Sequence, residues 1–221
     1  MSVESATPAT AVTPEAVDYF ANHQNKLRFP WSLYHGPIVR ELSRVLRAHP
    51  GKDVLNVGSG PFFELAELRD AGARYSLCDV DPRAMTMARE LYGDRLVRTD
   101  VIVPDAPLPY DTGSFDLVVS MDVIEHVKDP PPWLAELSRV LRPGGRLFLT
   151  TPNYGFSSLG LIERTVLEVI ARRQGFSRRD LHPSKFSRSR LRRTLAEAGF
   201  EQVQVKQLAL GWVLAASAVK R

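Results

Sequence analysis

The chain has 221 residues, of which 44% are hydrophobic and 24% are charged, and its formal net charge at pH 7 is +4. These values are normal for one globular domain that buries a substantial core. The sequence excludes a membrane-spanning helix, since no run approaches the roughly 18 consecutive apolar residues that such a helix needs. The single cysteine, Cys78, excludes an internal disulfide and a thiolate metal site, and a cytoplasmic location is expected.

The first residues form a polar stretch rich in Ser, Thr, Ala and Pro, MSVESATPATAVTPEA. This composition predicts a flexible leader over residues 1–14, and no signal peptide is expected because no basic start precedes an apolar run. Residues 15–50 are expected to form an N-terminal helical cover or lid, which contains the aromatic-rich piece YFANHQNKLRFPWSLYH.

From residue 51 onward, apolar runs alternate with segments of helical periodicity. Five runs predict strands, at 53–58, 74–80, 95–100, 114–121 and 145–152. Helices are predicted between them at 62–71, 82–92 and 131–142, the second one capped by Asp81. Strands separated by helices of this length predict a parallel sheet covered on both faces.

The end of the chain follows a different pattern. A helix that stops at Gly199 precedes two strands, 201–208 and 212–219, whose link is too short for a crossover helix, so they should pair antiparallel. The predicted fold is a doubly wound, Rossmann-like, mainly parallel α/β sheet that ends in a C-terminal antiparallel hairpin. Residues 153–182 interrupt the alternation beyond the carboxyl ends of the strands, and they are predicted to be a substrate-side insertion in the domain 51–221.

A glycine turn follows the first predicted strand, in DVLNVGSGPFF (53–63). Gly58 and Gly60 allow a tight strand-to-helix turn and the close approach of a ligand. The dinucleotide fingerprint G-x-G-x-x-G needs glycine where this chain has Phe63, so NAD is disfavoured. Asp79 ends the second strand, at the spacing of a carboxylate that binds ribose hydroxyls.

Later motifs indicate which ligand this is. VGSG, CDVDP, TDV…LPY…SFDLVVSMDVIEHV and VLRPGGRLFLTTPN form an ordered series that resembles the class I S-adenosylmethionine-dependent methyltransferases, and among them the small-molecule O-methyltransferases of quinone biosynthesis. The resemblance runs from about Asp53 to the C-terminus. It implies a seven-stranded sheet whose last strand inserts antiparallel, and S-adenosyl-L-methionine as the cofactor.

The resemblance also implies which residues bind the cofactor. The methionine portion would lie on the glycine turn, with its amino group against the backbone at the end of the fourth strand. Carboxylates after the second and third strands would bind the ribose hydroxyls and the adenine amino group, each with a valine beside the ring. The glycine turn is Gly58, Ser59 and Gly60, and the end of the fourth strand is Ser120 and Met121. The ribose carboxylate is Asp79 with Val80 beside it, and the adenine carboxylate is Asp100 with Val101 beside it.

Two positions depart from the family's motif. Asn56 stands where an acid usually supports the cofactor's amino group, and Phe62 stands where a third glycine is usual. Asn56 keeps a carbonyl acceptor but loses the charge, at a cost of about 1 kcal/mol of affinity. Phe62 is compatible with the site if its side chain turns away from the cofactor. A degenerate cofactor-binding scaffold therefore remains an alternative to an enzyme.

His126, in DVIEHV, is the candidate general base. Methyl transfer from a sulfonium is an in-line displacement, for which the protein aligns the nucleophile and excludes water. A hydroxyl acceptor also loses a proton, and an imidazole that follows the fourth strand can take it. We assign this role to His126 and expect a hydroxyl oxygen as the acceptor. A purely structural turn is the second interpretation of this histidine.

A divalent metal site is the third interpretation. DVIEH resembles the ExxEH of quinone-biosynthesis and small-RNA O-methyltransferases, where these residues bind a divalent ion. Asp122, Glu125, His126 and the distant His182 could form a similar site, although Asp122 is shorter than the usual glutamate. We assign no metal from the sequence.

The acceptor is expected to be a small molecule, with neither a membrane nor nucleic acid as partner. The aromatic and histidine residues predicted to wall its pocket are Tyr19, Phe20, His23, Trp31, Tyr34 and Tyr154. An RNA or a carrier-tethered substrate is the alternative, because residues 172–193 carry nine Arg or Lys against one acid, Asp180. No nucleic-acid-binding motif accompanies this basic region.

Overall fold

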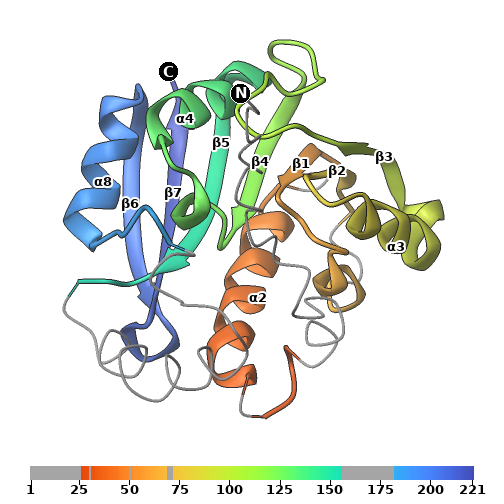
Figure 1. The fold of residues 1–221 in the computed structure, drawn as a ribbon, viewed down its shortest axis with the longest axis horizontal. Helices are drawn as coiled ribbons and strands as arrows, with labels where there is room; N and C mark the ends of the chain where they lie inside the picture. Colours follow the sequence, from red (N-terminus) through yellow and green to blue (C-terminus); the bar gives the residue numbers. More distant parts are fainter. Residues whose placement is uncertain (1–25, 30, 50, 69–71, 156–181) are drawn as a thin grey trace, which may run out of the picture.

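The computed structural model describes residues 26–29, 31–49, 51–68, 72–155 and 182–221. A seven-stranded sheet runs through this part of the chain, in the order β3-β2-β1-β4-β5-β7-β6 (Figure 1). Its strands are β1 (Asp53–Val57), β2 (Arg74–Asp79), β3 (Leu96–Val101), β4 (Phe115–Met121), β5 (Leu141–Pro152), β6 (Phe200–Leu208) and β7 (Val213–Lys220). The helices are α2 (Ser32–Arg47), α3 (Pro82–Tyr92), α4 (Pro130–Val140) and α8 (Arg188–Glu197).

Strands β1 to β5 pair parallel, and β7 inserts antiparallel between β5 and β6. In the centre of the sheet, Asn56 of β1 lies between Leu77 of β2 and Val119 of β4. The predicted doubly wound sheet with a C-terminal antiparallel hairpin is confirmed. The parallel pairing brings the carboxyl ends of β1 to β5 to one edge, where ligands bind in folds of this kind.

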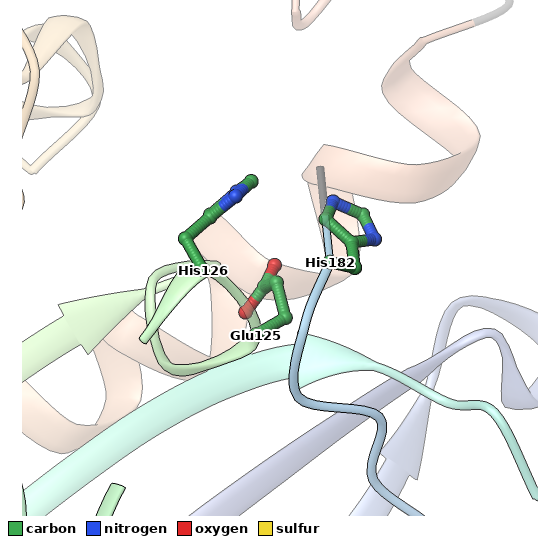
Figure 2. A group of neighbouring side chains, drawn as sticks. All are labelled: Glu125, His126 and His182. Carbon is green, nitrogen blue, oxygen red and sulfur yellow. The ribbon is translucent and has the colours of Figure 1, made fainter. Parts of the chain in front are cut away.

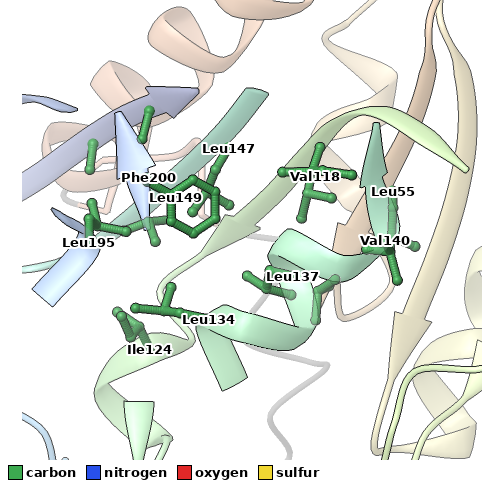
Figure 3. Close-up of a cluster of buried hydrophobic side chains, with 14 of the residues drawn as sticks. Leu55, Val118, Ile124, Leu134, Leu137, Val140, Leu147, Leu149, Leu195 and Phe200 are labelled. Carbon is green, nitrogen blue, oxygen red and sulfur yellow. The ribbon is translucent and has the colours of Figure 1, made fainter. Parts of the chain in front are cut away.

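Each face of the sheet has its own hydrophobic core, because the central strands are apolar on both sides. Leu55 of β1 belongs to the core under α4 and α8, whereas Val54 belongs to the core under α2 and α3. Figure 3 shows the first core, in which the helix residues Leu134, Leu137 and Leu195 pack on Leu55, Val118 and Leu149 of the sheet. The two cores fix the sheet, so its carboxyl edge is a rigid platform for a site.

The helix starts follow local sequence signals. The Asp81 carboxylate accepts a hydrogen bond from the Arg83 N–H at 2.8 Å, and Pro82 occupies the first position of α3, where its missing N–H costs nothing. Ser187 caps α8 in the same way. No helix in the described ranges is long and apolar enough to cross a membrane.

The helix predicted over 62–71 is wrong. Among the described residues of this segment, a single 3₁₀ turn (Phe63–Ala66) follows the glycine turn. Phe62 has φ 51° and ψ 48°, a left-handed conformation that cannot continue into a right-handed helix. The apolar spacing of Phe62, Leu65 and Leu68, which favoured a helix, serves to bury these side chains in the core under α2 and α3.

Two predicted segments are described only in part. Helix α2 belongs to the predicted N-terminal cover, and it packs through Tyr34 and Ile38 on the turn between β6 and β7. Of the predicted insertion at 153–182, the structure describes 153–155 and 182. The assignments of these segments as lid and substrate wall therefore stay predictions.

Candidate functional site

The glycine turn lies at the carboxyl end of β1, and its two glycines are needed for different reasons. Gly58 has φ +68°, and a Cβ added to it would lie 2.5 Å from Cγ2 of Val123, so Val123 packs directly on the turn. Gly60 has φ +52°, and a Cβ there would meet nothing within 4 Å. The turn is thus closed toward the segment after β4 and open at Gly60, where a ligand can approach the backbone.

Asp79 is tied to the same turn. Its carboxylate accepts hydrogen bonds from the backbone N–H of Gly60 at 2.8 Å and of Asp81 at 2.9 Å. Burial raises the pKa of Asp79, and these N–H donors partly counteract that effect. The carboxylate is therefore fixed beside the turn, with acceptor positions left for the hydroxyls of a ribose.

The side-chain amide of Asn56 is buried without a hydrogen-bond partner among the described residues. Its relative exposure is 0%, and neither its Oδ1 nor its Nδ2 has a hydrogen-bond partner among the described residues. Buried amides are almost always hydrogen bonded, so a water or a polar group of a ligand is expected to satisfy this one. Such an unpaired polar group one residue before the Val57–Gly58 step fits a site for the cofactor's amino group.

Phe62 does not enter the turn. Its side chain is 1% exposed, and its ring lies 5.8 Å from that of Tyr75 within the core under α2 and α3. The missing third glycine therefore leaves the turn open. The substitution of phenylalanine for glycine instead strains the backbone, because Phe62 has a Cβ and its φ is 51°.

The predicted adenine site lies at the ends of β2 and β3. Val80 and Val101 are each about half exposed, and the register pairs Asp79 with Val101, so apolar surface gathers beside the two carboxylates. Asp100 already has protein partners: it accepts a hydrogen bond from the Tyr110 hydroxyl at 2.8 Å and from Arg98 Nη2 at 2.8 Å.

The end of β4 adjoins the glycine turn. The Ser120 hydroxyl donates to the Val57 carbonyl oxygen at 2.8 Å, which fixes the two strand ends together. Met121, the next residue, packs against the same apolar cluster (Ile38, Ala209 and Val213) as Tyr34 of α2. The sequence-predicted residues of β1, β2, β3 and β4 therefore do converge on one edge of the sheet.

A group of acid and base side chains follows β4 directly. Glu125, His126 and His182 offer ligand atoms that all lie within 4.8 Å of one another, and Figure 2 shows the Glu125 carboxylate between the two imidazoles. Glu125 is buried and accepts a hydrogen bond from the Thr151 hydroxyl at 3.0 Å. The ring of His182 lies edge-on to that of His126, with 4.8 Å between the centroids.

His182 has its own supporting partner. Its Nδ1 forms a hydrogen bond with the Tyr154 hydroxyl, which leaves Nε2 on the other side of the ring. Histidines that bind a metal are commonly held in this way through the hydrogen bond of one ring nitrogen.

The donor set of Glu125, His126 and His182 fits a divalent cation. One carboxylate and two imidazoles suit such an ion, and Glu125 and His182 each have an outer hydrogen-bond partner. Two atoms that are each about 2.1 Å from one ion lie at most about 4.2 Å apart, so the observed 4.8 Å spread would have to contract slightly.

Asp122 is not part of this group, although the sequence offered it as a fourth ligand. Its φ is 53°, and its carboxylate accepts a hydrogen bond from the Thr150 hydroxyl at 2.8 Å. Burial raises the pKa of Asp122, and hydrogen bonds from Thr150 and Tyr34 counteract the rise. Tyr34 of α2 thus contacts the residue that immediately follows β4.

Comparison with known proteins shows what this chain is similar to. Residues 55–149 match the family model described as a methyltransferase domain. This match and the curated relatives support a class I S-adenosylmethionine-dependent methyltransferase domain in this part of the chain. The cofactor of this family is S-adenosylmethionine.

Two curated methyltransferases illustrate the similarity. The ubiquinone biosynthesis O-methyltransferase of Xanthomonas oryzae is 37% identical over 106 residues, which cover 47% of this chain and 44% of the relative. The protein of the same name from Burkholderia pseudomallei is 29% identical over 163 residues, covering 72% and 69%. The chain thus spans about half the length of the first relatives that it matches.

Solved methyltransferase structures share the fold. A methyltransferase from Aquifex aeolicus superposes with a TM-score of 0.64 at 17% identity, over 90% of this chain and 98% of that one. A Haloferax volcanii methyltransferase complex with the Trm112 activator gives 0.66 at 20% identity, over 90% and 94%. At these identities the likeness concerns the architecture.

The predicted acceptor side of the site is described in part. Trp31, at the start of α2, is half exposed, Tyr34 packs against the same cluster as Met121, and Tyr154 is hydrogen bonded to His182. The remaining predicted wall residues, Tyr19, Phe20 and His23, lie outside the described residues.

Three supporting residues of the site were not predicted. Thr151 holds Glu125, and Arg98 and Tyr110 hold Asp100. The Arg98 partnership could have been inferred, because residues two apart on a strand point to the same face. The other two contacts join separate elements and have no local sequence signal.

Proposed function

We propose that this protein transfers the methyl group of S-adenosylmethionine to a hydroxyl oxygen of a small molecule. The observation that carries the proposal is the contact between Gly58 and Val123. It joins the turn expected to hold the methyl donor to the segment that bears Glu125 and His126 only two and three residues later. A base on the segment that packs against the donor's turn suits an acceptor that must lose a proton.

The reaction needs little covalent help from the protein. The acceptor oxygen attacks the methyl carbon in line with the carbon–sulfur bond, which breaks as the oxygen–carbon bond forms. S-adenosylmethionine would supply the activated methyl group and would leave as neutral S-adenosylhomocysteine, and His126 would accept the hydroxyl proton. Alignment on the rigid strand ends and proton removal are therefore the contributions expected of this chain.

Oxygen is preferred to nitrogen or carbon as the acceptor atom for two reasons. The curated relatives named ubiquinone biosynthesis O-methyltransferase are 29–37% identical to this chain. An imidazole and a carboxylate beside the donor also suit a hydroxyl, since a neutral amine can attack before it loses its proton.

We propose Glu125, His126 and His182 as the residues that would hold a divalent cation. A bound cation would polarise the acceptor hydroxyl and so favour its ionisation. In the absence of a cation, Glu125 and His182 would orient His126 for the same proton transfer. Both arrangements use the same three side chains, so metal dependence separates them.

The first experiment is calorimetric titration with S-adenosylmethionine and S-adenosylhomocysteine, with EDTA or with Mg²⁺. Binding of both cofactor forms supports the proposal, and no binding of either refutes it. Binding without turnover on a panel of hydroxylated aromatic acceptors would favour the scaffold alternative. A dependence of turnover, but not of cofactor binding, on Mg²⁺ would support a cation at Glu125, His126 and His182.

His126→Ala then tests the base, with His49→Ala as the matched control at the end of α2. We expect turnover to fall by about 10²–10⁴-fold for His126→Ala, as is typical of lost acid–base catalysis, with unchanged cofactor affinity. His49 bonds a backbone carbonyl of its own helix, so its replacement should leave turnover unchanged. If turnover of His126→Ala falls by less than about tenfold, this histidine has a structural role and not a catalytic one.

We also propose that α2 belongs to a lid over the acceptor site. The support is that Tyr34 hydrogen bonds with Asp122, the residue after β4, and that Tyr34 and Met121 both pack against the apolar cluster of Ile38, Ala209 and Val213. Tyr34→Phe should raise KM for the acceptor more than it lowers cofactor affinity, whereas unchanged acceptor KM would argue against the lid.

The alternative acceptor, an RNA or a carrier-tethered substrate, has one supporting observation. Five exposed cations lie on or just before α8, and no ion pair of theirs is seen within the described residues: Lys185, Arg188, Arg190, Arg192 and Arg193. A polyanion bound there would dissociate steeply with salt. Turnover that is independent of salt would exclude this class.

A further inference from the structure

Asp100, at the end of β3, is held by an unusual number of protein donors for a ligand-binding carboxylate. Arg98 donates to it through Nη2, which is 2.8 Å from Oδ1, and the Nε of the same guanidinium lies 2.7 Å from Oδ2. The Tyr110 hydroxyl donates to Oδ2 at 2.8 Å. The carboxylate thus has a two-pronged ion pair on one side and a phenol on another.

The count of acceptor positions shows what remains. A carboxylate offers about four lone-pair positions, two on each oxygen. Tyr110 donates to Oδ2, which Arg98 Nε also approaches to 2.7 Å in the ion pair, and Arg98 Nη2 donates to Oδ1. One position on Oδ1 therefore stays available for a single further N–H donor.

The supports of Asp100 are themselves fixed. Tyr110 is buried, its ring packs edge-on against Phe115 with 5.1 Å between centroids, and its hydroxyl lies 3.4 Å from the Leu77 carbonyl oxygen. The Arg98 guanidinium lies 4.8 Å from the centre of the Tyr110 ring, in the geometry of a cation–π contact. The carboxylate plane is consequently set by two side chains that also contact each other.

Apolar surface lies next to this carboxylate. Val101 follows Asp100 directly and Val80 follows its strand neighbour Asp79, and both valines are about half exposed. A flat ring can pack on these valines with one edge toward Asp100. That edge must present an N–H donor to the open Oδ1 position, because a carbonyl oxygen there would face a carboxylate oxygen.

We propose that Arg98 and Tyr110 are positioning residues, which orient the Asp100 carboxylate so that the site selects a 6-aminopurine over a 6-oxopurine. The proposal rests on the function proposed above, in which an adenine nucleoside binds at this end of the sheet. Arg98 is half exposed and acts on the ligand only through Asp100, so its contribution is to specificity.

The test compares binding of S-adenosylhomocysteine with that of its 6-oxo analogue, S-inosylhomocysteine. The proteins are the wild type, Arg98→Ala, Arg98→Lys and Tyr110→Phe, with Arg89→Ala as the matched control. Arg89 is an exposed arginine in the last turn of α3 that takes no part in the proposed sites. Calorimetry gives each Kd, and thermal unfolding verifies that each variant is folded.

The wild type should prefer the adenine ligand by at least about tenfold, which corresponds to a cost of about 1.4 kcal/mol or more for the mismatched hydrogen-bond edge. Arg98→Ala should weaken S-adenosylhomocysteine binding by about tenfold and leave the 6-oxo ligand nearly unchanged, so the preference shrinks. Arg98→Lys and Tyr110→Phe should fall between the two, and Arg89→Ala should match the wild type.

Three outcomes would overturn the inference. The first is tighter binding of S-adenosylhomocysteine by Arg98→Ala, which would mean that Arg98 competes with the ligand for Asp100. The second is an equal loss of affinity for both ligands. The third is an unchanged preference in a folded Arg98→Ala variant. Failure of the wild type to bind either ligand would instead refute the proposed function itself, so the two failures are distinguishable.

Discussion

Replacing Phe62 separates the two properties that the structure gives this residue. Its side chain is 1% exposed and packs on Tyr75, so its removal opens a cavity in the core under α2 and α3. Truncation of a buried phenylalanine costs about 3–5 kcal/mol. Its left-handed backbone, with φ 51°, costs a residue with a Cβ roughly 1–2 kcal/mol and a glycine almost nothing.

Phe62→Ala keeps the backbone strain, whereas Phe62→Gly removes it. We expect the alanine variant to lose about 3–5 kcal/mol of unfolding free energy and the glycine variant about 1 kcal/mol less. At an ordinary right-handed position this order reverses, because glycine loses more conformational entropy on folding. Ala66→Gly, at the exposed last residue of the 3₁₀ turn nearby, is the matched control and should cost roughly 0.5–1 kcal/mol.

Urea unfolding followed by circular dichroism measures these free energies. If Phe62→Ala is as stable as Phe62→Gly, the left-handed backbone at this position is refuted. If both variants cost less than about 1 kcal/mol, the burial argument is refuted. S-adenosylhomocysteine affinity should change little in either folded variant, because the Phe62 side chain lies in the core and not in the turn.

Three other substitutions test the site. Asn56→Asp should lower the stability of the ligand-free protein by roughly 2 kcal/mol at neutral pH, because it buries a charge. The ammonium group of a bound cofactor should then stabilise this variant more than it stabilises the wild type. Equal ligand-induced Tm shifts in the two proteins would contradict this expectation. Burial raises the pKa of Asp79, so the folded state binds the proton more tightly than the unfolded chain, and the stability of the wild type relative to Asp79→Asn should fall as the pH rises above about 4. A flat or rising difference in urea unfolding across that range would show that Asp79 is not desolvated. Thr151→Val removes a donor from the buried Glu125 and should cost about 1–3 kcal/mol in the same assay; a neutral effect would mean that another group replaces the hydroxyl.

The architecture could be predicted from the sequence because apolar residues recur at the spacings typical of strands and helices. Alternating apolar strands and helices predicted the parallel sheet, and the short link near Gly211 predicted that β6 and β7 pair antiparallel. The helix over 62–71 failed because periodicity reports which side chains are buried and not the backbone that buries them. A phenylalanine in a left-handed conformation carries no sign of it in the local sequence.

The candidate site was predictable where one residue acts alone on one strand end. Asp79 and Gly60 were found this way, and the structure adds that they are bonded to each other. The Tyr154–His182 pair was not found, because the two residues are 28 positions apart and meet only in the folded chain. The open amide of Asn56 is also a tertiary property, since it depends on what the neighbouring strands fail to offer.

The position of β7 constrains the order in which the sheet can be completed. Within the described sheet β6 pairs with β7, and β7 in turn lies against β5. When synthesis has passed Leu208, the nascent chain therefore holds six strand sequences, of which β6 has no neighbour to join. Strand β7 joins β6 to the described sheet, so β6 keeps unpaired edges, open to pairing with other chains, until β7 is in place.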